Sequence, residues 1–454
     1  MSRPAAGKSL DAQIAAWRTF VRRRVAIHGT DADELEDHLR DEVAALRHNG
    51  LDDDEAFLIA VKRLGDLDAI AREFAREHSG RLWKQLVSVS AATDDDTIRT
   101  WRVVACLAVL AAAAVKLPAL FGVPLDEANA SFYARNASLF VLPLLTAYFV
   151  WHRGLSVVIA SRLFGGFALA AVVANSFPFE PGSDTEILLI LHLPISLWLL
   201  VGVAHSGGAW GPSANRMNFV RFTGELFIYF VLIALGGGVL IAFTLMMFAT
   251  IQLDAERFVA AWLLPCGAAG AFIVAAWLVE AKQSVIENMA PVLTRLFTPM
   301  FAAVCIGFLV AFAWTGNAID IEREVLIGFD LLLVVVVGLV VYAVSARDPA
   351  LPPNAFDALQ LLLVVSALAV DAVALTAIVS RISEFGFTPN RVAALGENLI
   401  LLANLAGSAW LYVELLRRRR TLATLERWQT AFLPVYALWA AFVVLVFPPV
   451  FGFR

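Results

Sequence analysis

Hydrophobic and polar positions divide the chain into two unlike parts. Up to about Arg99, charged residues alternate with apolar residues at helical spacing, and long apolar runs then follow one another to the end of the chain. A run of about 20 apolar residues is long enough to cross the hydrocarbon core of a bilayer as a helix. The pattern therefore predicts an all-α protein. It has a small cytoplasmic helical bundle (residues 1–82), a connector (83–100) and a multi-pass transmembrane domain (101–454).

The N-terminal part carries the periodicity of amphipathic helices. Leu35, Leu39, Val43 and Leu46 fall on one face of a predicted helix, and Gly50 supplies a stop signal after it. Further segments with the same spacing follow. We expect these segments to pack their apolar faces together as a small helical domain.

Eleven apolar runs in the remainder of the chain reach or approach the length of a membrane span. The second is the shortest, and the last ends at two prolines. An odd number of spans would place the two chain termini on opposite sides of the membrane. The expected limits are Trp101–Leu120, Ala137–Trp151, Leu155–Ser176, Ile187–His205, Phe222–Phe248, Phe258–Val279, Leu296–Trp314, Val325–Val344, Asp357–Ile378, Leu395–Leu416 and Phe432–Phe447.

Basic residues are distributed unevenly between alternate loops. With the N-terminus in the cytoplasm, the inner loops hold Arg153, Arg216, Arg221, Lys282, Arg295, Arg347, Arg417 to Arg420 and Arg427. The outer loops hold Arg135, Arg257, Arg323, Arg381 and Arg391, and they include the acidic stretches "PLDEANA", "FEPGSDTE", "LDAER" and "DIERE". Because basic loops stay in the cytoplasm, we expect the N-terminus inside and the C-terminus outside.

Composition and motifs exclude several classes of function. The net charge of −5 offers no basic excess for binding nucleic acid. Phosphate-binding loops, nucleophile elbows and zinc-ligand spacings are absent from the sequence. We therefore expect no catalytic residues, no metal site and no cofactor, and hence no enzyme.

The candidate ionisable side chains inside the membrane are Lys116, Arg162, His192, Glu225 and Asp371. Such residues are costly in a bilayer and usually face the interior of the helix bundle. At 1.5 Å per residue, Asp371, His192 and Lys116 lie in the outer half of the membrane, and Arg162 and Glu225 lie toward the inner face. Depth predicts two pairings, Asp371 with His192 or Lys116, and Arg162 with Glu225. Alternatively, Lys116 and Glu225 extend to the membrane surface.

The N-terminal segment contains an ordered set of residues: Leu35, His38, Leu39, Leu46, Gly50-Leu51, Glu55-Ala56, Ala60 and Arg63-Leu64-Gly65-Asp66. With this set the segment resembles the permease prefix domain, which stands ahead of bacterial membrane permeases and some membrane-bound regulatory proteins. The resemblance implies a cytoplasmic interaction module without catalysis, and so a cytoplasmic protein partner that binds residues 1–82. It also implies the bacterial inner membrane as the location.

A second motif, "RISEFGFTPNRVAAL", lies between the ninth and tenth runs. It resembles the signature of a family of uncharacterised multi-pass bacterial membrane proteins, a domain of unknown function, and implies no activity. Thr388 or Asn390 can cap the tenth helix beside the turn-forming proline. Arg381 and Arg391 flank this outer loop, where an anion contact is the alternative to a structural role. The residues of the motif are Arg381-Ile382, Gly386 and Thr388-Pro389-Asn390-Arg391.

A glycine triplet, Gly236-Gly237-Gly238, stands in the middle of the fifth run. Small residues allow membrane helices to pack closely, and the triplet favours that arrangement. An unwound segment, as in transporters with broken helices, is the alternative.

Two functions fit these patterns. The first is a membrane-embedded sensor or regulatory protein, in which the prefix-like domain relays a state to its cytoplasmic partner. The alternative is a secondary transporter or permease-like protein with a polar site around Asp371. A transporter should have several facing polar groups around a cavity, and a sensor should have a dry, packed bundle. No pattern specifies a small-molecule ligand, so the predicted contacts are the lipid bilayer and the cytoplasmic partner.

Overall fold

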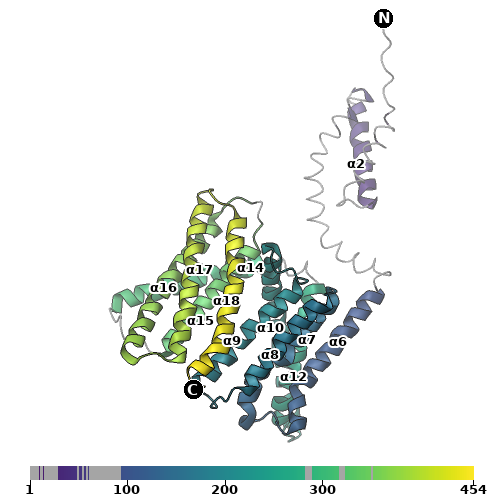
Figure 1. The fold of residues 1–454 in the computed structure, drawn as a ribbon. Coiled ribbons are helices and arrows are strands. Elements are labelled where there is room, and N and C mark those ends of the chain that lie inside the picture. The colour runs from purple at the N-terminus through teal and green to yellow at the C-terminus, as the bar shows by residue number, and fades with distance from the viewer. Residues whose placement is uncertain are drawn as a thin grey trace. The chain divides into compact units, whose positions relative to one another are not determined.

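The computed structural model forms two compact units, Met1–Arg99 and Thr100–Arg454 (Figure 1). The described residues contain helices and no strand. They are residues 10, 14, 29–48, 51–53, 56–57, 60, 94–281, 289–315, 323–348 and 351–454.

The first unit contains helix α2 (Gly29–His48). Leu39, Val43 and Leu46 are buried on one face of this helix, as the apolar spacing predicts. Ala56 and Ala60 are fully buried as well. The other predicted helices of the small bundle lie largely outside the described residues.

In the second unit, every expected span corresponds to a helix. In order these are α6 (Asp94–Lys116), α7 (Ala130–His152), α8 (Val157–Ser176), α9 (Asp184–His205), α10 (Ser213–Thr250), α12 (Leu264–Ala281), α14 (Met289–Thr315), α15 (Arg323–Ser345), α16 (Ala355–Phe385), α17 (Pro389–Leu416) and α18 (Leu422–Val450). Short elements join some of them: η1 (Leu117–Phe121), η2 (Glu127–Asn129), α11 (Glu256–Phe258) and the π-helical turn η3 (Val259–Leu263), which continues into α12. Within the described residues, ten helices are long and apolar enough to cross a membrane, and α7 is not one of them.

Helix α7 nevertheless extends from one end of the bundle to the other. Near its start, Arg135 Nε lies 3.3 Å from Glu186 Oε1 at the start of α9. Directly after its end, Arg153 Nη2 lies 2.7 Å from Glu280 Oε2 at the end of α12. Twenty-three residues of helix measure about 34 Å, which is enough to cross a hydrocarbon core. Length and composition identify ten spans. Following the chain from one end of the bundle to the other adds α7 as an eleventh crossing.

Contacts between helix ends define two ends of the bundle. At one end, which we call the Arg454 end, the amide of Thr185 at the start of α9 donates to Arg454 O (3.1 Å). At the opposite end, the Glu280 end, Arg221 Nε on α10 donates to Ser345 O at the end of α15 (2.6 Å). Under the predicted orientation these are the outer and inner ends.

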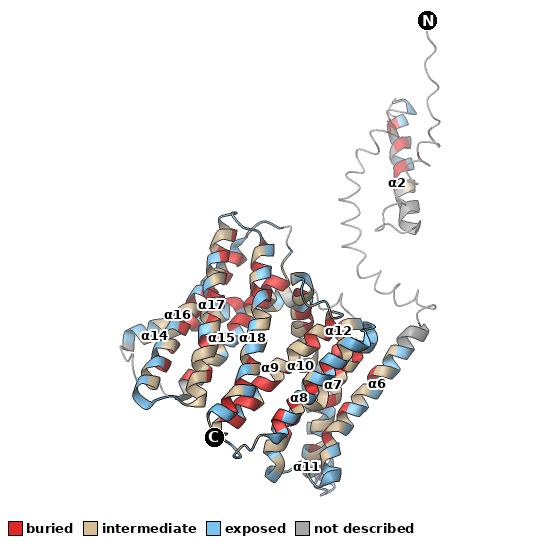
Figure 2. Ribbon diagram, viewed as in Figure 1, coloured by how far each residue is buried: buried red, intermediate tan, exposed pale blue. Residues whose placement is uncertain are grey.

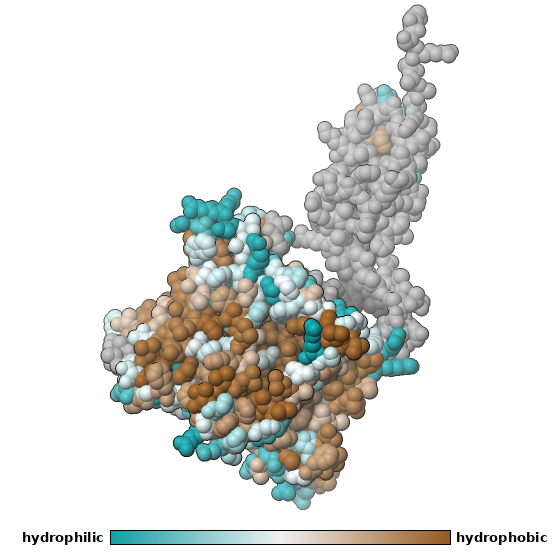
Figure 3. All heavy atoms as spheres, in the orientation of Figure 1, coloured by the Kyte–Doolittle hydropathy of each residue, from teal (hydrophilic) through white to brown (hydrophobic). Residues whose placement is uncertain are grey.

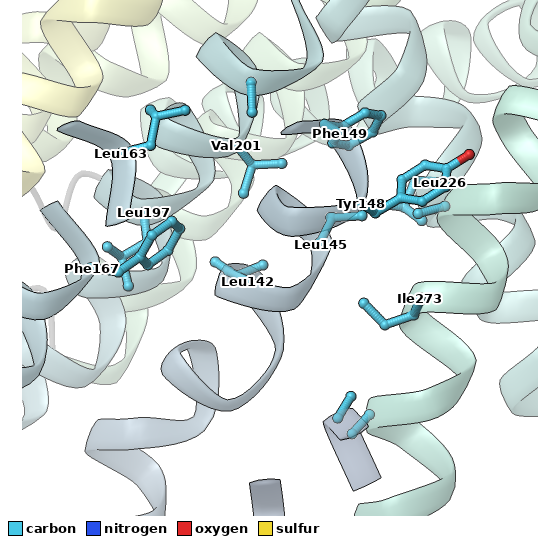
Figure 4. Close-up of a cluster of buried hydrophobic side chains, with 14 of the residues drawn as sticks. Leu142, Leu145, Tyr148, Phe149, Leu163, Phe167, Leu197, Val201, Leu226 and Ile273 are labelled. Carbon is cyan, nitrogen blue, oxygen red and sulfur yellow. The ribbon is translucent and has the colours of Figure 1, made fainter. Parts of the chain in front are cut away.

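Two large hydrophobic cores and a smaller one between α9, α17 and α18 hold the second unit together. In the first, Leu145 and Phe149 of α7 pack with residues of α8, α9, α10 and α12, including Ile273 (Figure 4). The second joins α14, α15, α16 and α17, with Leu333 and Leu363 fully buried. The buried residues line the helix faces that point into the bundle (Figure 2). Helix α18 packs on α9 and α17, and α10 packs on both α12 and α15, so these contacts connect the two cores.

The side faces of the second unit are apolar, and hydrophilic residues gather toward its ends on the visible face (Figure 3). Large side chains such as Phe227, Leu240 and Trp314 are 68%, 67% and 90% exposed. Apolar surfaces of this extent are rare on soluble monomers. Together with the ten apolar helices, they identify an integral, multi-pass membrane protein whose side faces contact the lipid bilayer.

The glycine triplet does not have the role expected of it. Gly236, Gly237 and Gly238 lie in the continuous helix α10, and nothing stands where their side chains would be. They therefore neither pack closely against described residues nor unwind the helix. Close approach occurs at other glycines, because an added Cβ would collide with the ring of Trp439 at Gly396 and of Trp428 at Gly407.

Candidate functional site

Asp371 lies in α16 and has no exposed surface. Neither of its carboxyl oxygens has a hydrogen-bond partner. His192, one predicted partner, is instead bonded within its own helix, through Nδ1 to Leu188 O (2.8 Å). The predicted pairing of Asp371 with His192 is therefore wrong.

Lys116, the other predicted partner, is also engaged elsewhere. Its Nζ donates to the carbonyl oxygen of Ala261 in the π-helical turn η3. The ammonium group also stands over the ring of Trp262, 4.5 Å from its centroid, where a cation is stabilised by the aromatic face. A carbonyl and an aromatic ring satisfy this amine, so the pairing of Asp371 with Lys116 is wrong as well.

The second predicted pair is also not formed. Arg162 is exposed on α8, whereas Glu225 is 7% exposed on α10. No ion pair joins these two side chains in the described structure. Depth along the membrane normal matched them, but Arg162 lies on the exposed surface of α8 and Glu225 is buried.

The structure instead groups Asp371 with two other acids from neighbouring helices. Asp330 of α15 is close enough to interact electrostatically with both Asp371 and Glu397 of α17. The three helices pack against one another. Asn398 Nδ2 donates to Asp330 Oδ1 (2.7 Å) and to Ala394 O in its own helix (2.8 Å). We call Asp330, Asp371, Glu397 and Asn398 the acidic cluster.

The acidic cluster has no compensating cation among the described side chains. None of its three carboxyl groups forms an ion pair within the described ranges. Asn398 is completely buried, and its Oδ1 has no donor. An ionised carboxylate without a partner costs several kcal/mol in a protein interior. The described acids are not spaced as the ligands of a metal ion, so the cluster is suited to taking up a single positive charge rather than a metal.

Sequence reasoning missed Asp330 and Glu397. Both fall close to the ends of their expected spans, at Val325 and Leu395, where an acid is ordinarily solvated. Asp330, Asp371 and Glu397 lie about 10, 21 and 12 Å from the ends of their helices nearest the Arg454 end, at 1.5 Å per residue. The usable signal was the presence of an acid in each of three consecutive spans.

A polar cavity of about 460 Å³ lies at the Glu280 end, and its lining includes Arg153, Arg221, His205, Glu225 and Glu280. The side chain of Glu280 is buried, and its Oε1 lies 3.2 Å from His205 Nε2. Its other oxygen, Oε2, is the one that contacts Arg153. This group links the ends of α7, α9 and α12, so each of its members has a structural role.

A second cavity, of about 650 Å³, is almost entirely apolar. It lies between α6, α7, α9, α10 and α12, where Tyr133, Trp198 and Phe272 are among its lining residues. No described acid of the cluster lines either cavity.

The loop motif between α16 and α17 has structural contacts. Thr388 is the N-cap of α17, and its Oγ1 accepts from the amide of Arg391 (3.4 Å). Arg391 Nη1 donates to the carbonyl oxygens of Phe385 and the following glycine (3.0 and 2.8 Å), which closes the end of α16. Asn390 lies inside α17 and is not its cap, and Arg381 is half-buried in the last turns of α16.

Comparison of the chain with protein-family models, curated proteins and solved structures finds no match. The chemistry of the buried carboxyl groups is the basis on which a function can be assigned.

Proposed function

We propose that this integral membrane protein is a secondary transporter in which Asp330, Asp371 and Glu397 form the ion-coupling site. The observation that carries the proposal is the convergence of three carboxyl groups from three neighbouring helices without a described cationic partner. Unpaired acids inside a membrane protein are expensive, and they mark ion pathways and proton relays. Because the acids of the cluster line neither cavity, the proposal requires the helices to separate before the site meets water.

The division of the second unit into two hydrophobic cores supports the same function. The first core is built on α6 to α10 and α12, and the second mainly on α14 to α17. Alternating access requires one body of helices to rock against another around a fixed site. The acidic cluster belongs to the second core, and the polar cavity belongs to the first.

A transport experiment with a mixture of solutes tests the proposal. The full-length protein is reconstituted in liposomes, a mixture of small metabolites is added, and an ion gradient is imposed. Mass spectrometry of the liposome contents then measures accumulation. We expect at least one solute to accumulate only when the gradient is present, and Asp371→Asn to abolish this.

The matched control is Glu384→Gln, which removes an exposed acid from the same helix and should leave accumulation intact. Gradient-dependent accumulation that is equal in Asp371→Asn and the parent would overturn the role of the cluster. Absence of accumulation for every solute would overturn transport itself.

A regulatory function is the second candidate. The compactness of Met1–Arg99 as a separate unit favours it, as does the buried face of α2. In this case the acidic cluster would sense an ion, and residues 1–82 would pass the signal to a cytoplasmic protein. Limited proteolysis of residues 1–82 in membrane vesicles tests this. Protection that changes with pH in the parent but not in Asp371→Asn, without transport of any solute, would favour regulation.

A further inference from the structure

Asp371 is enclosed in a way that suits an uncharged carboxyl group. It has no exposed surface, and neither oxygen has a hydrogen-bond donor. A buried charge needs a counter-ion or several donors, whereas a protonated carboxyl group carries no net charge and can itself donate. The surroundings of Asp371 therefore favour the protonated form.

Among the side chains that the structure describes, the helices packed against α16 bring no basic group to Asp371. Helix α15 contributes Asp330, and α17 contributes Glu397, which both carry the same sign of charge. Helix α14 contributes the thiol of Cys305, which hydrogen-bonds with Ser366, five residues before Asp371.

The charged residues further along these elements are placed away from the cluster. Arg295 of α14 is exposed. On α16 itself, Asp357 is paired with Arg347 (Oδ1 to Nη1, 2.8 Å) near the Glu280 end. Arg381 lies ten residues beyond Asp371, which is about 15 Å at 1.5 Å per residue.

Asn398 makes the three acids unequal. Its amide donates to Asp330, which stabilises the ionised form of that carboxyl group. Its Oδ1 is buried beside Asp330 and has no donor, so it is a free acceptor for a protonated acid. Of the three acids, Asp371 is the one with no donor and no exposure.

We propose that the acidic cluster is a proton-binding site, in which Asp371 carries the proton while the cluster is closed. On opening of the cluster, the O–H bond of Asp371 breaks and the proton passes to water, which leaves a carboxylate. This inference rests on the proposed function, because it names the ion that the coupling site carries.

A metal cation fits the same place less well. Hard cations require a cage of several oxygen ligands at defined distances. Asp371 lines neither of the two cavities, and it is completely buried. A proton needs neither a cage nor a cavity.

Infrared spectroscopy of the full-length protein in lipid nanodiscs tests the proposal. A protonated carboxyl group has a carbonyl stretching band that a carboxylate lacks. We expect the parent protein at neutral pH to show this band, Asp371→Asn to lose it, and the control Glu384→Gln to keep it. An unchanged band in Asp371→Asn would overturn the assignment.

Two further measurements cover a variant that fails to fold and a site that binds a metal cation. If Asp371→Asn fails to fold, Asp371→Glu retains a carboxyl group, and the band should persist at a shifted frequency. An unshifted band in Asp371→Glu would overturn the proposal. Addition of sodium chloride at constant pH should leave the band intact, and its loss would identify a metal-cation site instead.

The experiments can refute the proton site and the transport function independently of each other. A protonated Asp371 without solute accumulation in liposomes would refute transport and leave the proton site standing. Gradient-driven accumulation by a protein whose Asp371 is ionised at neutral pH would refute the proton site and leave transport standing.

Discussion

Replacing Asp371 by valine should leave the protein about as stable as the parent. In a buried ion pair, removal of one partner strands the other charge and costs about 3–5 kcal/mol. Asp371 has no partner to strand, because both of its oxygens are without donors. An unsatisfied buried polar group costs about 1–3 kcal/mol, and valine removes that cost. Valine is bulkier than aspartate, so crowding in the packed interior offsets part of this gain. We therefore expect the free energy of unfolding to fall by no more than about 1 kcal/mol.

Asp330→Val is the matched comparison from the same cluster. Asp330 accepts from Asn398 Nδ2 at 2.7 Å, and Asn398 is completely buried. Valine at this position leaves that amide with one acceptor fewer, which costs about 1–3 kcal/mol. The structure therefore predicts that Asp330→Val is the less stable of the two variants.

Unfolding by detergent titration in mixed micelles, followed by tryptophan fluorescence, measures both variants. A double-mutant cycle with Lys116→Met checks the absence of a pair, since independent sites should add. A loss of about 3 kcal/mol or more for Asp371→Val, the size expected of a broken buried pair, would refute this reasoning if it were recovered when Lys116 is also replaced. The same recovery with His192→Leu would refute it too.

Three further predictions follow from the path of the chain and its packing. Alkaline phosphatase should be active when it is fused after Arg454 and inactive after Arg420, and the reverse pattern would refute the predicted orientation. Gly407→Ala should cost about 1–3 kcal/mol in detergent melts because its Cβ meets a tryptophan ring. By contrast, the Cβ that Gly237→Ala adds lies in open space, so this variant should not destabilise the protein. Residues 1–90 should express as a soluble helical domain of modest stability, and an unfolded circular dichroism spectrum would contradict this.

The course of the helices in the second unit was predictable because apolar length alone decides whether a helix can span a bilayer. The third expected span, Leu155–Ser176, differs from α8 by two residues at its start. A larger difference is at α10 (Ser213–Thr250), which begins nine residues before the expected span at Phe222. Its first turns are polar, and they extend beyond the apolar run to line the cavity at the Glu280 end. Hydropathy records where a helix is apolar, not where it begins.

The lateral arrangement was not predictable in the same way. Sequence gives each residue a depth, but the partner of a buried group depends on how each helix is rotated about its axis. Lys116 and Asp371 matched in depth, yet Lys116 bonds to Ala261. The environment of a glycine depends on helix rotation in the same way. Gly407 packs against an aromatic ring, whereas Gly237, on a different helix, has no described atom near the position of an added Cβ. Rotation is set by the packing of all neighbours together, which a single sequence pattern does not contain.

Three other buried acids differ from Asp371 because each of them has a cationic partner. Glu186, Glu280 and Asp357 are each nearly inaccessible, and each has an arginine within 3.3 Å. These acids lie near the helix ends, where an arginine reaches them without its charge being buried in hydrocarbon. Asp371 lies deeper, and the neighbouring helices present two more acids instead of a base. The contrast between these arginine-paired carboxylates and the unpaired Asp371 supports the proposal that Asp371 binds a proton reversibly.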